Sequence, residues 1–193
     1  KENDPHLHAV ALDVIRRSLD YELRVTNKVD NPFGYARQTF LYRDSVKDGF
    51  FIPHENETGW WWQGENARLA SLATAAVVGG RLVYPHAGGW GVKDSLARFA
   101  SEQVSWILGC NPYSLCFMYQ FGRKNVPYMQ SNFGHGSEKG GISNGITGGK
   151  DRRDGSGIDF RTSDDGNEWR WTEQWIPHAA WCLQMLVATA SGE

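Results

Sequence analysis

Residues 92–112 read VKDSLARFASEQVSWILGCNP, and this stretch decides the class of fold expected for the chain. Its apolar side chains recur every three or four residues, which is the period of a helix with one buried face. They are Leu96, Phe99, Ala100, Val104, Ile107 and Leu108. Gly109 is placed to cap the helix, and Asn111-Pro112 prevents it from resuming. The pattern predicts a helix over residues 92–108.

Three more segments have helical spacing. Asp4-Pro5 is typical of a helix start, and the apolar residues that follow predict a helix to about Thr26. The run ARLASLATAAVV predicts a helix over 64–78 that stops at Gly79-Gly80. A last helix is expected to begin near Pro177. No strand alternation is evident, so the prediction is an all-α fold.

Two segments between these helices are too long to be plain connectors. Residues 27–59 and 111–175 are rich in glycine, asparagine and aspartate, with aromatic residues close by. One alternative is a disordered linker over 134–157. Because long loops in compact domains are usually functional, the favoured interpretation is a helical bundle whose loops gather at one end into a site.

The composition argues against several classes of function. A formal net charge of -2 does not favour nucleic acid, and no apolar run approaches the roughly 20 residues of a membrane span. The opening KENDPH lacks the features of a signal peptide, so the chain is expected to begin after an export signal or inside a longer protein. A periplasmic or secreted location is expected. Three cysteines without a Cys-x-x-Cys pair are interpreted as small buried hydrophobic residues: Cys110, Cys116 and Cys182.

Tryptophan is the outlier of the composition, with nine residues in the chain. Trp60, Trp61 and Trp62 are consecutive, so they cannot all face one core. A second group lies near the end: Trp169, Trp171, Trp175 and Trp181. Flat aromatic faces stack on sugar rings, and an indole N–H can donate to a hydroxyl. Core packing is the alternative for any single tryptophan, but the two groups together favour a carbohydrate cleft.

Acidic residues accompany the second tryptophan group, in the segment 159–181. They are Asp159, Asp164, Asp165, Glu168 and Glu173. A carboxylic acid packed against indole rings is desolvated, which raises its pKa and suits it to act as a general acid. A solvated acidic loop and a calcium site are the alternatives. The six histidines include no His-Glu-x-x-His zinc motif, and no metal is expected in the chemistry.

Several short motifs resemble glycoside hydrolase family 9 in their order and spacing. Residues 106–112, WILGCNP, resemble the family's "hydrophobic-Leu-Gly-x-Asn-Pro" signature, and Phe121-Gly122 matches the Phe-Gly that follows it. Residues 140–145 resemble its glycine-rich loop loosely. Residues 173–180, EQWIPHAA, resemble the segment that carries the catalytic acid before the last helix. Residues 61–66, WWQGEN, are similar to bacterial branches of the family.

The resemblance implies an (α/α)6 barrel, of which residues 1–193 would be the C-terminal part of the catalytic domain. It implies hydrolysis of β-glycosidic bonds with inversion, in an oligosaccharide or polysaccharide. One carboxylic acid protonates the leaving oxygen, and a carboxylate opposite activates water. No cofactor is required, although a structural calcium ion in the Asp- and Gly-rich loop is compatible with the sequence.

Two glutamates compete for the role of acid. Asn167-Glu168 preserves the family's literal Asn-Glu pair, whereas Glu173 preserves the spacing to the last helix. Helix register cannot slip by five residues without rotating the apolar face, so Glu173 is favoured and Glu168 is the alternative. Thr172 stands where the family has asparagine. The expected substrate-binding residues are His135, Trp60, Trp61, Trp62, Trp175 and Arg161.

The family's catalytic base belongs to a closely spaced aspartate pair early in the domain, and no equivalent is found in this sequence. We therefore expect a second chain or an upstream fragment to pack against this one and supply the base. Two alternatives from other classes are kept. One is a carbohydrate-binding protein without catalysis, and the other is a helical-barrel sugar enzyme such as an epimerase, which would work with histidine bases.

Overall fold

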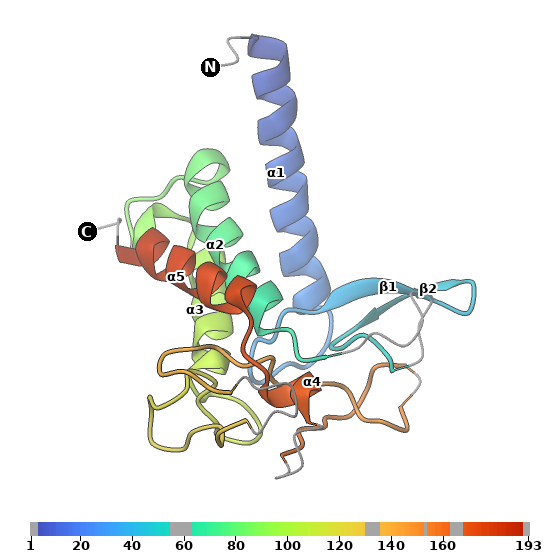
Figure 1. Ribbon diagram of the computed structural model, residues 1–193. Helices are drawn as coiled ribbons and strands as arrows, with labels where there is room; N and C mark the ends of the chain where they lie inside the picture. The colour runs from blue at the N-terminus through green and yellow to red at the C-terminus, as the bar shows by residue number, and fades with distance from the viewer. Residues whose placement is uncertain (1–3, 55–62, 130–135, 153, 163–167, 191–193) are drawn as a thin grey trace.

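The computed structural model describes residues 4–54, 63–129, 136–152, 154–162 and 168–190. The predicted substrate residues Trp60, Trp61, Trp62 and His135 lie outside these ranges. The order of elements is α1, β1, β2, α2, a 3-10 turn, α3, α4 and α5. Figure 1 shows the helices α2, α3 and α5 grouped together, with the hairpin and the long loops at one end of them.

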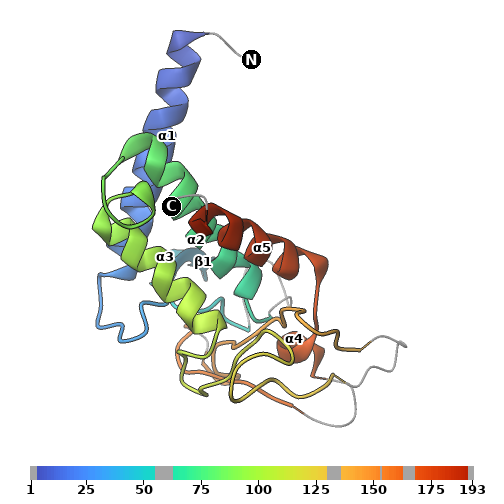
Figure 2. The same ribbon diagram turned by 90° about the vertical axis from the view of Figure 1, so that its left-hand side faces the viewer.

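Helix α1 spans Pro5–Thr26, as the sequence predicts. The Asp4 carboxylate accepts hydrogen bonds from the backbone N–H groups of His6 and Leu7, so it caps the helix that Pro5 starts. The first part of α1 projects beyond the other helices in both views (Figures 1 and 2). Leu7, Val10 and Val14 on this part are exposed.

The core lies among three helices, α2 (Asn66–Val83), α3 (Asp94–Ile107) and α5 (Ile176–Ala190). The predicted end of α2 at Gly79-Gly80 is wrong, because the helix continues through both glycines. A β-carbon on Gly80 would lie 3.0 to 3.3 Å from atoms of Leu96 and Val92, both buried. These glycines therefore allow neighbouring elements to approach α2 closely and do not end the helix.

Helix α3 carries the stripe predicted for it, with Leu96, Phe99, Ala100 and Ile107 buried. The end of α3 also agrees with the prediction, since Gly109, which follows the helix, has a φ of +124°. Asn111 then stabilises the turn that follows. The Asn111 side-chain amide donates to the carbonyls of Trp106 and Leu115, both at 2.8 Å. The motif 106–112 thus turns the chain sharply from α3 into the long loop.

The predicted all-α fold is wrong, because the loop after α1 contains an antiparallel hairpin and the structure is mixed α/β. Strand β1 (Gln38–Tyr42) pairs with β2 (Ser45–Gly49), with Tyr42 opposite Ser45. The connecting residues Arg43 and Asp44 both have positive φ, 48° and 59°. That is the geometry of a two-residue hairpin turn, which Asn-Gly usually marks in sequences. In this protein the two turn residues are Arg43 and Asp44, so the sequence carries only a weak signal for the hairpin.

The long loop after α3 is folded rather than extended, and it contributes Phe117, Ile142 and Ile146 to the core. It contains one short helix that the sequence did not predict, α4 (Trp169–Thr172). Figure 2 shows α4 and the loops together below the three core helices. The loops therefore gather at one end, as expected for a site.

The cysteines only partly follow the prediction that all three are buried. Cys116 and Cys182 are buried as expected, but Cys110 is exposed, and all three are free thiols.

Helix α5 buries His178, Cys182 and Met185, whereas Leu183, Leu186 and Val187 on its other face are exposed. Within the described residues, no helix has the length and apolar character needed to cross a membrane.

Candidate active site

Glu173 lies between α4 and α5, where the chain crosses the end of the helical core. Its backbone N–H donates to the Trp169 carbonyl at 3.1 Å, and its carbonyl accepts from Asn144 N–H at 2.9 Å. The next residue, Gln174, forms an isolated antiparallel bridge with Ser143. The backbone of Glu173 is therefore fixed on one side by α4 and on the other by the glycine-rich loop.

The side chain of Glu173 is half-buried and lies beside a tryptophan. The indole Nε1 of Trp175 donates a hydrogen bond to Oε2 of Glu173. Trp175 is 38% exposed, so it remains accessible to a ligand. Glu173 and Trp175, both predicted to be site residues, are thus brought together.

The loop that holds Glu173 is itself fixed to the start of α2. The side-chain amide of Asn66, which is buried, donates to the Ser143 carbonyl at 2.9 Å. The Asn66 backbone N–H donates to the Asn144 carbonyl at 3.0 Å. Asn66 atoms also lie 2.6 to 2.8 Å from where a β-carbon on Gly145 would be, and Gly145 has a φ of +103°. Only glycine suits that position, because a side chain would be strained and would displace Asn66.

Asn144 links this loop to both ends of α4. Its side-chain amide donates to the Trp169 carbonyl at 2.8 Å, and its backbone N–H donates to Glu173. Gly64 N–H, just before α2, donates to the Arg170 carbonyl at 2.9 Å. Neither Asn66 nor Asn144 was predicted as a site residue from the sequence. The only signals were the asparagines within the WWQGEN segment and the glycine-rich loop.

Glu168, the alternative acid, lies at the other end of α4. Its carbonyl accepts from the Thr172 hydroxyl at 3.0 Å. Its carboxylate interacts electrostatically with two guanidinium groups, those of Arg161 and Arg170. Arg170 lies 4.3 Å from the centre of the Trp169 ring, and burial lowers its pKa. The two glutamates thus differ in surroundings, Glu168 beside arginines and Glu173 beside Trp175.

Arg161 lies over Trp171. Its guanidinium carbon is 5.5 Å from the centre of the Trp171 ring, and it pairs with Asp159 at 2.9 Å. The hydrogen bond from Arg161 to Asp159 raises the arginine's pKa further. Trp171 is buried, and its indole donates to the Thr147 hydroxyl at 2.9 Å. Trp171 is therefore a packing residue that supports Arg161.

Two of the described histidines are partly or fully buried. His54 shares a 3.0 Å hydrogen bond with the Gly148 carbonyl, and burial lowers its pKa. His178 is buried in α5, and burial lowers its pKa to about 4. Among the described residues, no group of three or more histidine, cysteine or acidic side chains is placed to hold a metal ion. Asp164 and Asp165 lie outside those ranges.

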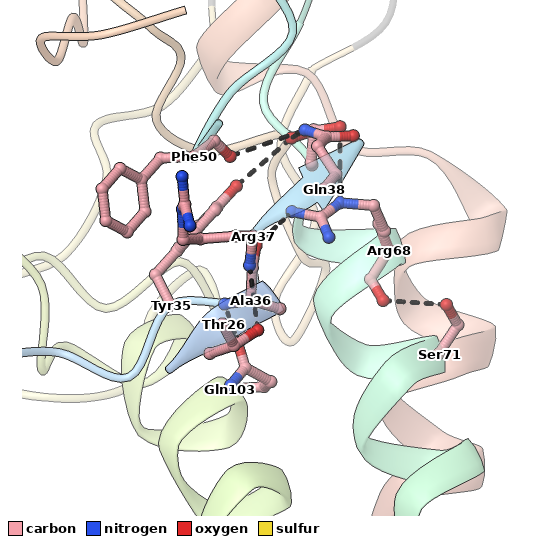
Figure 3. Close-up of polar contacts among 10 residues, drawn as sticks. Thr26, Tyr35, Ala36, Arg37, Gln38, Phe50, Arg68, Ser71 and Gln103 are labelled. Atoms are coloured by element: carbon pink, nitrogen blue, oxygen red, sulfur yellow. Dashed lines mark hydrogen bonds and ion pairs between the residues drawn. The ribbon is translucent and has the colours of Figure 1, made fainter. Parts of the chain in front are cut away.

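A buried polar cluster joins the hairpin to the start of α2, next to Asn66. Glu65 accepts hydrogen bonds from Gln38 at 2.8 Å and from the Tyr35 hydroxyl at 3.3 Å, and it pairs with Arg68 at 3.4 Å. Arg68 also donates to the Ala36 carbonyl at 2.8 Å (Figure 3). Burial is the main cause that raises the pKa of Tyr35 above its usual range, and the Glu65 charge adds to it. The cluster fixes the segment that in turn holds the loop beneath Glu173.

No family model matches the chain, and no curated protein matches it significantly. The similarity to glycoside hydrolase family 9 therefore stays a prediction from the short motifs.

Proposed function

We propose that this protein hydrolyses β-glycosidic bonds with inversion and that Glu173 is the general acid. The observation that carries the proposal is the setting of Glu173, a half-buried carboxyl group that shares a hydrogen bond with Trp175 at the loop end of the core. A general acid must be held at a defined place beside the glycosidic oxygen. The backbone contacts of Glu173 with Trp169 and Asn144 provide such a fixed place.

The contact with Trp175 also orients the Glu173 carboxyl group. An indole N–H only donates, so Oε2 of Glu173 acts as the acceptor. The exposed part of the Trp175 ring offers an apolar face to a sugar next to this oxygen.

We propose Arg161, Trp60, Trp61, Trp62 and His135 as further substrate-binding residues. Arg161 is partly exposed above Trp171, and its guanidinium group donates to hydroxyl or ring oxygens. The tryptophans and His135 enter the proposal from their place in the sequence alone.

The reaction also needs a base, and we propose that a second polypeptide or an upstream segment supplies it. Exposed apolar side chains on two helices support such a partner. They are Leu7, Val10 and Val14 on α1, and Leu183, Leu186 and Val187 on α5. Apolar side chains that recur on one helix face usually pack against another element.

The test compares Glu173→Gln with Glu168→Gln in the assembled protein, using aryl β-glycosides with good and poor leaving groups. Glu173→Gln should reduce kcat on the poor leaving group by a factor on the order of 10²–10⁴, the usual contribution of a general acid. It should affect the good leaving group much less, because that group departs without a proton.

Glu168→Gln is the matched control and should change both rates less than about tenfold. If Glu168→Gln alone gives the loss, the acid is Glu168. If the wild-type assembly binds glycosides and cleaves none, the protein is a carbohydrate-binding protein and the proposal is wrong.

A further inference from the structure

A chamber lined with aromatic rings lies on the hairpin side of the loop end, separate from Glu173. Its volume is about 260 Å³. Tyr35, Phe51 and Trp106 are buried at its base, with Phe33 and Phe50 beside them. Asp30, Pro112 and Ile158 complete its rim. Neither Glu173 nor Trp175 lines it.

The rings of the chamber are held in place by one another. The Tyr35 ring centre lies 4.6 Å from that of Trp106 and 4.9 Å from that of Phe51. Phe33 meets Trp106 edge-on at 5.7 Å. The side chain of Asn31, a polar group in the lining, is already used, because it accepts from Tyr35 N–H and donates to the Tyr35 carbonyl. The chamber therefore favours an apolar, flat group over one that needs hydrogen bonds.

The size of the chamber suits one substituted aromatic ring. An apolar cavity of about 150 Å³ is enough to hold benzene. A whole sugar would leave several hydroxyl groups without hydrogen-bond partners against these rings, which is unfavourable.

A polar groove adjoins the chamber and shares Asp30 and Phe50 with it. The groove has a volume of about 640 Å³, and its charged lining consists of Asp30, Arg37, Lys47, Asp48 and Asp154. The guanidinium carbon of Arg37 lies 5.3 Å from the centre of the Phe50 ring, and Figure 3 shows the two side chains next to each other. It donates to the carbonyls of Val25 and Asp48, both at 2.9 Å. Its Nε is buried without a hydrogen-bond partner among the described residues.

The mixed charges of the groove indicate the kind of group that it binds. Two cationic and three acidic side chains line it, so neither a cation nor an anion is strongly preferred. Hydroxyl groups both donate to carboxylates and accept from guanidinium or ammonium groups, so they match such a lining.

We propose that the chamber and the groove together bind a small molecule in which one aromatic ring is joined to an uncharged, hydroxyl-rich group, as in an aryl glycoside. The ring occupies the chamber, and the hydroxyl groups lie in the groove near Asp30 and Arg37. This is a binding site, and it does not depend on the proposed role of Glu173.

Calorimetric titration of the chain with three probes tests the proposal: phenyl β-glucoside, methyl β-glucoside and phenol. Phenyl β-glucoside should bind at least about tenfold more tightly than either of the others, because only it reaches both compartments. Equal binding of phenol and phenyl β-glucoside, or of the two glucosides, would overturn the joined site.

Two variants locate the bound probe. Ile158→Phe enlarges a rim residue that is 44% exposed, so it should narrow the chamber without disturbing the core and weaken phenyl β-glucoside about tenfold. Ile176→Phe is the matched control, at an isoleucine of α5 that is 85% exposed and not in the lining, and should leave binding unchanged.

Unchanged binding in Ile158→Phe, or equal weakening in Ile176→Phe, would place the probe outside the chamber and overturn this inference. Neither result bears on whether Glu173 is an acid, which the cleavage assay decides separately.

Discussion

At the scale of single residues, the hydrogen bond between Trp175 and Glu173 would link substrate contact to acid orientation in the proposed mechanism. The indole N–H donates to Oε2 of Glu173, and Trp175 is partly exposed. A sugar stacked on Trp175 would then also pack against the group that orients the proposed acid. This coupling predicts that the two roles of Trp175 are separable by substitution.

Trp175→Phe removes the N–H donor and keeps an aromatic face. We expect kcat of the assembled enzyme to fall about fivefold with KM changed little, since one hydrogen bond contributes about 1 kcal/mol. Trp181→Phe is the matched control, because Trp181 is also 38% exposed and lies on α5. Steady-state kinetics on one aryl β-glycoside measures both variants. A KM effect without a kcat effect in Trp175→Phe would show that Trp175 binds substrate and does not orient Glu173.

From the sequence, Glu173 could be proposed as a candidate acid, but the residues that hold its backbone could not be predicted. Its candidacy rests on spacing to the last helix, which is local information. Asn66 and Asn144 hold it through hydrogen bonds between segments far apart in the chain, and such pairs leave no periodic pattern. Their polar side chains are typical of loops in general. Only the fold shows that both are buried.

At the scale of elements, the helices could be predicted because their apolar period is local. Helix α1 matched its prediction at both ends, and α3 matched closely. The interpretation of Gly79-Gly80 as a stop failed, because the glycines serve packing against Ile15 and Leu96, which the local sequence does not reveal. The hairpin was not predicted because each of its strands has only five residues and the turn between them lacks glycine.

Helix α5 carries an element-scale prediction about pH, through its buried His178. Burial lowers the folded-state pKa of His178 to about 4 from 6.5, because the imidazolium is poorly solvated there. The unfolded chain takes up this proton below pH 6.5, while the folded chain does not until about pH 4. The contribution of neutral His178 to the free energy of unfolding is thus fully present above pH 6.5 and is lost as the pH falls toward 4. The lost free energy of unfolding is about 3 kcal/mol.

Urea unfolding at several pH values between 7 and 4 measures this effect. His178→Leu should flatten the decline relative to wild type, because the variant cannot take up the proton when it unfolds. His86→Leu is the control, at an exposed histidine, and should keep the wild-type slope. An unchanged slope in His178→Leu would mean that the buried ring is not what makes the fold acid-sensitive.

At the scale of the whole molecule, two apolar faces remain uncovered, one on each of two helices. The α1 face consists of Leu7, Val10 and Val14, and the α5 face of Leu183, Leu186 and Val187. Single exposed apolar residues are ordinary, but here each set recurs on one helix. Helix α5 begins at Ile176, shortly after Glu173 in the chain, so a segment that packs along α5 to its start would also reach Glu173.

These faces predict how the chain behaves when it is purified alone. We expect the 193-residue chain to self-associate with rising concentration and to hydrolyse no aryl β-glycoside at an enzymatic rate, since the proposed base is supplied elsewhere. Val10→Glu combined with Leu183→Glu should make it monomeric without lowering its stability, because both side chains are exposed. Analytical ultracentrifugation and urea unfolding measure the two effects.

Val46→Glu is the matched control for these charges, at a hairpin valine that is 74% exposed, and it should leave self-association unchanged. In the assembled enzyme, the same double substitution should reduce activity by preventing the partner from docking, while Val46→Glu should not. A wild-type chain that stays monomeric at high concentration and cleaves glycosides by itself would show that the base lies within these residues, and a partner would then have no place in the mechanism.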